Sequence, residues 1–394
     1  MTLPGRPRIG QQSLRSDGKT GYLPTLDGWR AVAILAVICQ HDSLHSIGPF
    51  TTEWLFQHGG WSGVDLFFAI SGLLICSRLL EEERVFGRIS LRNFYIRRAF
   101  RILPPALAYL GVIAVLISTG VLHIGWRELL GSALFLRNYS SIMGKLGPDS
   151  YFVGHFWSLA VEEHFYLILP AMLLLTRRGW RVPVLLGFSL IVAAHRFQVL
   201  GSRPWGEVLF HSDIRLDGLL IPAAFAVFAQ SSKARETMRK WLRFWPFLLI
   251  PVMILYSRWE GSFWQMTLVA VLIPMAVLGA VLNPNGYLAL TLEWAPFKYL
   301  GRISYGVYLW QELLFTRHVN LGNPLGILES TPLRYAATLG IAMASYHFLE
   351  RPLIKMGHKL APPATPGRDD ITNYVPNAGR SVGGPPSQVE ANSQ

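Results

Sequence analysis

An arginine and a histidine with ten residues between them are the residues of this sequence best placed for chemistry. Both belong to the apolar segment 26–45 (LDGWRAVAILAVICQHDSLH), with Arg30 near one end and His41 toward the other. In a helix that rises about 1.5 Å per residue, the guanidinium and the imidazole would lie roughly 16 Å apart, about half the thickness of a bilayer core. The spacing predicts one membrane helix with a fixed cation at one face and a titratable base near the other.

His41 taken alone fits a hydrogen-bonded residue of the membrane interface as well as a general base. Two carboxylates favour the base, because a carboxylate that accepts the imidazole N–H fixes its tautomer and raises its basicity. Asp42 is adjacent, and Asp65 lies near the same end of the next apolar segment, 61–80. We therefore predict that His41 and Asp65 are catalytic. The glycines of that stretch, Gly59, Gly60, Gly63 and Gly72, also fit close helix packing.

Three arginines stand where the third apolar segment begins, in FYIRRAFRILPP at 94–105. Arg97 and Arg101 lie one helical turn apart, and Arg98 lies three residues before Arg101. Guanidinium groups bind phosphate bidentately, so the cluster predicts a site for a phosphorylated cofactor at the membrane surface. An ordinary basic membrane anchor is the alternative. Arg30, which is expected on the same side, favours the phosphate site.

Acidic side chains open the fourth apolar segment, in HFWSLAVEEHFYLILP at 155–170. Glu162, Glu163 and His164 follow one another, which is costly in lipid unless they face a wet cavity or partners. We expect Glu162 or Glu163 to orient a base or to bind a sugar hydroxyl.

Two further groups of side chains carry alternatives. Trp157 and Tyr166 fit either a sugar-stacking platform or the aromatic belt of a membrane protein. Arg215 and Asp217 lie two residues apart at the start of the sixth apolar segment; we expect them to neutralise each other, and substrate binding is their alternative role.

The composition indicates a polytopic membrane protein. Of 394 residues, 51% are hydrophobic and 15% are charged, and apolar segments recur along nearly the whole chain. The net charge of +12 comes from basic clusters between these segments, a pattern typical of cytoplasmic loops and not of nucleic-acid binding. Cys39 and Cys76 lie inside apolar segments and imply no disulfide framework. No HExxH, paired CxxC, Walker or GxSxG motif supports a metal, nucleotide-hydrolysis or serine-hydrolase site.

We expect an all-α bundle of about ten transmembrane helices. The candidate spans are 28–45, 61–80, 102–120, 156–176, 183–200, 214–230, 244–258, 264–282, 299–317 and 333–350. An even number of spans and the distribution of basic residues place both termini in the cytoplasm. Residues 1–24 form a polar tail without the apolar core of a signal peptide, 25–358 the membrane domain and 359–394 a disordered tail rich in Pro, Gly and Ser. A short helix is expected at 129–137 in the long outer loop.

Seven motifs resemble, in order, those of the acyltransferase-3 family of bacterial membrane proteins. They are Arg30-x10-His41 after LDG, GVDLFFAISG at 63–72, FYIRRAFRILP at 94–104, FWSLAVEEHFYLILP at 156–170, RLDGLL at 215–220, LGRISYGVYLW at 300–310 and FLERP at 348–352. The resemblance covers about residues 24–358. One departure is Gln311 after Trp310, where many members have histidine.

The resemblance implies O-acyl transfer, commonly of acetyl from cytoplasmic acyl-CoA to a sugar hydroxyl on a surface polysaccharide, lipid-linked glycan or macrolide. In the family, the position of His41 is catalytic, those of Arg30, Arg98 and Arg101 are associated with acyl-CoA, and that of Glu162 belongs to the active site. The expected partners are acyl-CoA, a sugar-containing acceptor and the bilayer of the bacterial inner membrane, without a metal or nucleic acid.

The residues and the resemblance predict the same mechanism. Arg98 and Arg101, with Arg30, hold the phosphates of acyl-CoA, and the thioester enters the bundle toward His41. His41 then deprotonates the acceptor or receives the acyl group first. This mechanism requires a path through protein between the arginines and His41. A secondary transporter or acyl-group exporter and a non-catalytic scaffold are the rival classes.

Overall fold

The computed structural model describes residues 23, 25–41, 52–139, 146–147, 149–203, 208–258, 262–315 and 331–363, with backbone alone at 52–61, 258 and 331. All regular structure in these residues is helical. The prediction of an all-α protein is confirmed for this part of the chain.

The longer helices carry most of the predicted spans. They are α1 (Leu26–His41), α2 (Thr52–Phe86), α3 (Leu91–Ser118), α6 (Phe156–Leu175), α7 (Arg181–Leu200), α13 (Phe263–Leu282), α15 (Ala295–Phe315) and α16 (Thr331–Ala344). A π-helical segment, η5 (Ser345–Glu350), continues α16 into α17 (Arg351–Leu360).

Shorter helices connect or interrupt the longer ones. They are α4 (Trp126–Ala133), α9 (Ser212–Arg215), α10 (Asp217–Phe228), α11 (Ser232–Trp241), α12 (Leu249–Arg258) and α14 (Tyr287–Leu292), with 3-10 turns η1 (Ser150–Val153), η2 (Arg178–Trp180) and η3 (Leu242–Leu248). The short helix expected at 129–137 overlaps α4, which begins three residues earlier and ends at Ala133.

Five helical segments of the described chain are long and apolar enough to cross a membrane. They are Ser62–Phe86, Leu91–Ser118, Ser150–Leu175, Arg178–Leu200 and Phe263–Leu282. Where the structure describes them, the other predicted spans are helical but shorter, broken or, in the 21-residue α15, interrupted by charged side chains. For example, the seventh is divided between η3 and α12, with non-helical backbone at Phe244 and a proline at Pro246. The arrangement in ten spans therefore stays a prediction.

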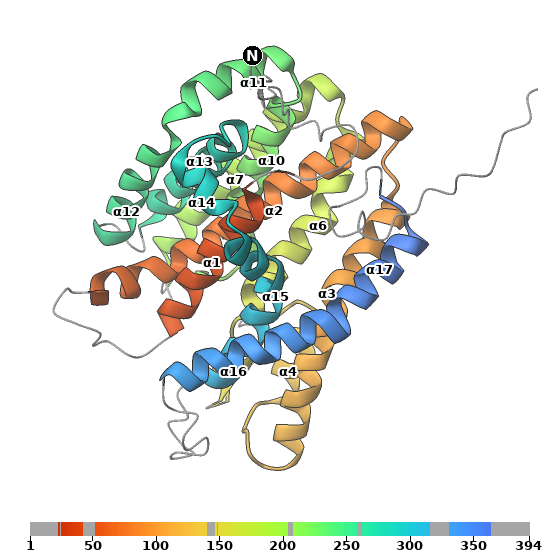
Figure 1. Ribbon diagram of the computed structural model, residues 1–394, viewed down its shortest axis with the longest axis vertical. Coiled ribbons are helices and arrows are strands. Elements are labelled where there is room, and N and C mark those ends of the chain that lie inside the picture. Colours follow the sequence, from red (N-terminus) through yellow and green to blue (C-terminus); the bar gives the residue numbers. More distant parts are fainter. Residues whose placement is uncertain are drawn as a thin grey trace, which may run out of the picture.

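Helices α1, α2, α10 and α15 form the centre of the molecule (Figure 1). Helix α1 packs against α2 and α15, and α2 packs along α10. A Cβ atom at Gly63 would collide with the Ala33 carbonyl of α1, and one at Gly72 with the Leu219 carbonyl of α10. The prediction of close packing is thus confirmed at Gly63 and Gly72. Gly59 and Gly60 lie in the part described by backbone alone.

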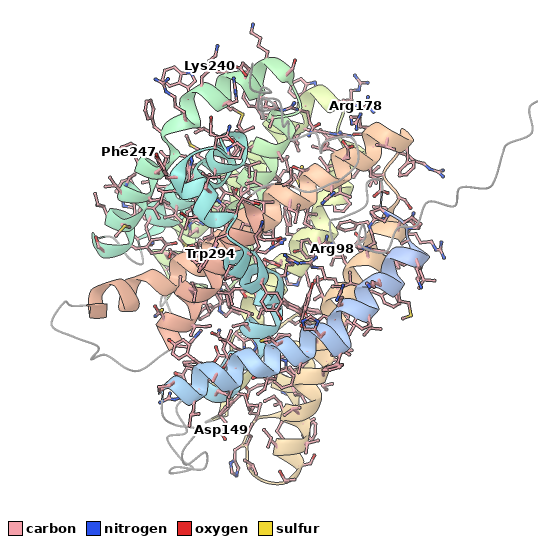
Figure 2. All side chains as sticks on the ribbon, viewed as in Figure 1. Arg98, Asp149, Arg178, Lys240, Phe247 and Trp294 are labelled. Atoms are coloured by element: carbon pink, nitrogen blue, oxygen red, sulfur yellow. The ribbon has the colours of Figure 1, made fainter. Side chains whose placement is uncertain are left out.

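Helices α3 and α17 lie side by side at the edge of this centre (Figure 1). The basic side chains divide into inner and outer ones. Arg98 on α3 lies within the bundle, whereas Arg178 and Lys240 project from its periphery (Figure 2). Arg178 and Lys240 are each 73% exposed at the side chain. The exposure of Arg178 and Lys240 is ordinary for solvated charges. A charged arginine inside the bundle, as at Arg98, is costly unless it has a function.

Candidate functional site

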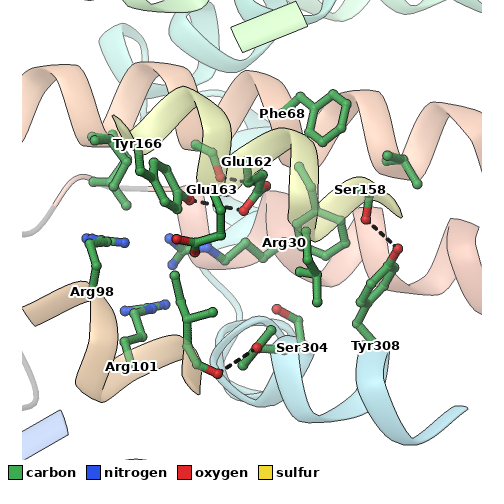
Figure 3. A pocket seen from close by; sticks show the side chains of 18 residues that line it. Arg30, Phe68, Arg98, Arg101, Ser158, Glu162, Glu163, Tyr166, Ser304 and Tyr308 are labelled. Atoms are coloured by element: carbon green, nitrogen blue, oxygen red, sulfur yellow. Dashed lines mark hydrogen bonds between the residues drawn. The ribbon is translucent and has the colours of Figure 1, made fainter. Parts of the chain in front are cut away.

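A small cavity of about 100 Å³ lies between α1, α2, α3, α6 and α15. Arg30 reaches it from α1, and Arg98 and Arg101 reach it from α3 (Figure 3). Glu162 and Glu163 reach it from α6. The structure therefore brings together residues of three separate sequence motifs.

A basic cavity of about 230 Å³ adjoins the small one. The two share lining from Arg30, Leu74, Ile75, Arg98, Arg101 and Tyr305. Eight arginine or lysine side chains and four carboxylates line the basic cavity. This excess of positive charge suits a polyanion such as a diphosphate, because guanidinium groups form charge-assisted hydrogen bonds to phosphate.

Two of the shared arginines are available for such bonds. Within the described residues, neither Arg98 nor Arg101 has a hydrogen bond or an ion pair, although the Arg98 guanidinium lies over the Tyr166 ring at 5.6 Å. Ser90 caps the start of α3, where its side chain accepts from the Asn93 N–H, and the three-residue spacing puts both guanidinium groups on one face. Arg30 donates to Asp27 at 3.0 Å.

Arg97 differs from its neighbours. It lines the basic cavity, but its guanidinium donates to Glu82 at 2.6 Å and to the Ala361 carbonyl at 3.4 Å. Its ion pair links α3 to the end of α2, so its hydrogen bonds are largely committed within the protein.

The adjacent glutamates face the small cavity, as the prediction of a wet environment or partners requires. Glu162 accepts hydrogen bonds from the Ser71 and Tyr166 hydroxyls, each at 3.0 Å. His164 points elsewhere and its Nδ1 lies 2.6 Å from the Ser212 hydroxyl. Glu162, Glu163 and Tyr166 thus belong to one site with the arginines.

Ser158 and Tyr308 close the end of the small cavity opposite Arg98 and Arg101 (Figure 3). Their hydroxyl oxygens are 2.6 Å apart, and the Tyr308 hydroxyl also donates to the His155 carbonyl at 3.0 Å. Both residues are buried. We call this pair the hydroxyl wall.

His41 lies past the hydroxyl wall and lines neither cavity, so neither cavity reaches the imidazole and the required path between the arginines and His41 stays a prediction. Its Nε2 is 3.2 Å from Glu312 Oε1, and Glu312 follows Tyr308 on α15 by one helical turn. Its Nδ1 is buried and has no hydrogen-bond partner in the described part. If Nε2–H donates to Glu312, the lone pair of Nδ1 is available to take a proton.

The predicted partnership of Asp65 with His41 is wrong. Asp65 accepts from Arg215 at 2.7 Å and from the Tyr256 hydroxyl, and among the described residues the carboxylate paired with His41 is Glu312. Asp42 lies outside the described residues.

The predicted neutralisation of Arg215 by Asp217 is also wrong. Residues two apart point to different sides of a helix, so each meets another element. Asp217 pairs with Arg196 of α7 at 2.7 Å, and the Arg196 side chain is fully buried.

Trp157 belongs to the Arg215 cluster and does not line the small cavity. The Arg215 guanidinium lies 5.6 Å from the Trp157 ring centroid and 5.8 Å from that of Phe68. Phe68 lines the small cavity, so this cluster adjoins it from behind.

Several site residues were missed by sequence reasoning. Glu312 and Arg196 carried a usable signal, since each is a charge within a predicted apolar span. Ser71, Ser158 and Tyr308 lie within three of the family motifs, but nothing in the motifs distinguished these hydroxyls from their neighbours, since isolated hydroxyls are common in membrane helices. Gln311, the departure from the family pattern, is fully buried, with no hydrogen bond from its amide to a described residue.

Among the described residues, no group of three or more His, Cys, Asp or Glu could hold a metal.

Comparisons with known proteins agree with the motifs. A family model described as an acyltransferase domain matches residues 23–345. The chain is 30% identical over 368 residues to the putative peptidoglycan O-acetyltransferase of Bacillus subtilis, covering 86% of this chain and 56% of that protein. It is also 30% identical over 371 residues to the peptidoglycan O-acetyltransferase OatA of Listeria monocytogenes, covering 85% and 56%.

A putative O-acetyltransferase of Staphylococcus aureus is 27% identical over 378 residues, covering 86% of this chain and 59% of that protein. The chain therefore spans little more than half the length of these relatives. No solved structure matches it significantly.

Proposed function

Because this chain belongs to the acyltransferase-3 family, we propose that it is a membrane-bound O-acyltransferase that moves an acyl group from acyl-CoA to a hydroxyl of a sugar-containing acceptor. The names of the relatives, peptidoglycan O-acetyltransferases, support acetyl as the group and a glycan as the acceptor. One observation carries the proposal. Three arginines converge on a cavity whose far end lies one helical turn from a histidine–carboxylate pair.

The basic cavity is the proposed site for the phosphates of acyl-CoA. Arg98 and Arg101 supply guanidinium forks that are not engaged with described carboxylates, and Arg30 completes the cluster. Arg97 adds positive charge while it stays paired with Glu82. The pantetheine arm then extends into the small cavity, where Glu162 and Glu163 can accept from its amide N–H groups and Tyr166 holds Glu162 in place.

His41 is the proposed base or acyl acceptor. As a base, Nδ1 takes the proton of the acceptor hydroxyl while its oxygen attacks the thioester carbon. The C–S bond breaks, and the thiolate leaves as CoA-SH with that proton. As an acyl acceptor, Nδ1 attacks the thioester carbon, the C–S bond breaks and CoA leaves as the thiolate. The acceptor hydroxyl oxygen then attacks the acyl-imidazole, the N–C bond breaks, and the hydroxyl proton ends on the thiolate as CoA-SH. In both routes Glu312 stabilises the positive imidazole.

The remaining predicted residues are proposed on the acceptor side or in the scaffold. Trp157 and Arg215 adjoin the small cavity through Phe68 and offer an aromatic face and donors to a sugar. Asp65 orients Arg215, and Asp217 holds α10 to α7 through Arg196.

The proposed setting is the cytoplasmic membrane of a bacterium. We propose about ten spans within 25–358, with both termini and the basic cavity on the cytoplasmic side, where acyl-CoA is made. Residues 1–24 and 359–394 are proposed cytoplasmic tails.

The test is acyl transfer in membranes that contain His41→Gln. We expect loss of transfer of labelled acetyl from acetyl-CoA to membrane glycan, with normal amounts of protein. His347→Gln is the matched control, because His347 is exposed at η5 and lines neither cavity. Full activity of His41→Gln would overturn the assignment of His41. Ion-coupled uptake without consumption of acetyl-CoA by the wild-type protein would favour a transporter instead.

A further inference from the structure

The hydroxyl wall faces the leading end of the donor proposed above, and this inference rests on that function. The thioester is at the tip of the pantetheine arm, remote from the phosphates. With the phosphates at Arg98 and Arg101, the acyl group enters first and meets Ser158 and Tyr308 (Figure 3). Between Tyr166, beside Arg98, and Ser158 there are two turns of α6, which is about 12 Å at 1.5 Å per residue.

Packing holds the Tyr308 side chain in place. Its ring meets the Phe67 ring edge-on at 6.2 Å and the His155 ring at 5.5 Å. Its hydroxyl is tied to Ser158 and to the His155 carbonyl. A rigid ring in this position sets how far a chain can extend along the cavity.

The polar atoms of the wall favour a short acyl group. Ser158 Oγ also lies 3.2 Å from the His155 carbonyl, so three oxygen–oxygen contacts share two hydroxyl hydrogens. One hydroxyl can therefore turn toward the carbonyl of an acyl group and give up only one of these hydrogen bonds. An additional methylene would have to displace the packed Tyr308 ring or lie against the hydroxyl oxygens of the wall, and either costs free energy.

We propose that Tyr308 and Ser158 are the specificity-determining residues for acyl length and restrict the donor to acetyl and similarly short acyl-CoA. Glu312, the partner of His41, lies one turn further along α15 than Tyr308. The wall thus presents a short acyl group close to the base and excludes longer ones.

The experiment compares kcat/KM for acetyl-, butyryl- and octanoyl-CoA in purified full-length protein with a glycan acceptor. Tyr308→Val opens the wall, and we expect the butyryl-to-acetyl ratio to rise about tenfold or more, as for one or two methylenes in a shaped pocket. Ser158→Val adds bulk at the same end, and we expect that ratio to fall. Tyr308→Phe keeps the ring and should leave the ratio low while it lowers kcat for acetyl-CoA.

Tyr305→Val is the matched control, because Tyr305 lines the shared arginine end one turn earlier on α15. We expect no change in its butyryl-to-acetyl ratio. A ratio that stays at the wild-type value in Tyr308→Val and Ser158→Val would overturn the inference, and Ser158→Val alone decides if Tyr308→Val does not fold. A wild-type protein that uses no acyl-CoA would instead overturn the proposed function.

Discussion

The strongest single prediction concerns Glu312, because its carboxylate is the partner of His41 and lies outside both cavities. Glu312→Gln keeps the size of the side chain and an oxygen that can accept from Nε2–H, but it removes the negative charge. The neutral hydrogen bond keeps the imidazole oriented. What is lost is the stabilisation of the positive imidazole that forms during transfer.

The size of the effect follows from the geometry. A hydrogen bond to a charged group contributes about 1.5–3 kcal/mol and a neutral one about 0.5–1.5 kcal/mol, so the charge contributes roughly 1–2 kcal/mol. The Glu312 side chain is only 6% exposed, but that of His41 is 36% exposed, and solvent at the imidazole moves the expected loss toward the lower value. At 1.36 kcal/mol per factor of ten, kcat should fall about 5- to 10-fold.

The assay is steady-state acetyl transfer with acetyl-CoA varied. Because Glu312 lines neither cavity, KM for acetyl-CoA should stay near the wild-type value while kcat falls. Glu236→Gln is the matched control, since Glu236 lies on α11 with its side chain 48% exposed. Wild-type kcat in Glu312→Gln, or a change confined to KM, would refute the reasoning that this carboxylate acts on the base.

Three further predictions test the scaffold and the donor site. Arg98→Lys should raise KM for acetyl-CoA about tenfold with a smaller change in kcat, because an ammonium group cannot bind phosphate bidentately; an unchanged KM would remove Arg98 from the donor site. Asp217→Asn should destabilise the protein by about 3–5 kcal/mol, measured by unfolding in detergent, because the fully buried Arg196 loses its counter-charge; unaltered stability would contradict this. Gly63→Ala should destabilise by about 1–3 kcal/mol through its collision with α1, whereas Gly111→Ala, with no atom within 4 Å of the added methyl group, should not; equal effects would exclude the steric explanation.

Local pattern was enough to find the helices and the arginine cluster. Apolar length predicts helices because a membrane leaves backbone groups no partner outside the helix. Arg98 and Arg101 are three residues apart, so their shared face follows from helix geometry alone. The close approach of α2 to its neighbouring helices at Gly63 and Gly72 could also be predicted from the sequence, since only small residues permit it.

Pairing between distant side chains could not be predicted in the same way. Asp65 is 150 residues from Arg215 in the sequence, and its pairing depends on the rotation of α2 against α9. Asp42 and Asp65 were reasonable partners for His41 by proximity, but α1 packs against α15 and so presents Glu312 to the imidazole. The hydroxyl wall has the same origin, since Ser158 and Tyr308 are also 150 residues apart.

With acyl-CoA in the two cavities and His41 as the base, the separation of His41 from the cavities protects the thioester from hydrolysis. A base with free access to a thioester would activate water as readily as an acceptor hydroxyl, and acyl-CoA would be hydrolysed without transfer. The hydroxyl wall lies between the small cavity, where the thioester is proposed to enter, and Glu312, the partner of His41. Transfer therefore requires the hydroxyl contacts of Ser158 and Tyr308 to rearrange while the packed Tyr308 ring stays in place. Binding of the acceptor is the event best suited to supply the free energy for this, as in enzymes that assemble the catalytic site only with both substrates bound. Consumption of acyl-CoA should therefore depend strongly on the presence of the acceptor. In Tyr308→Val this dependence should be lost, and acyl-CoA should be hydrolysed without acceptor.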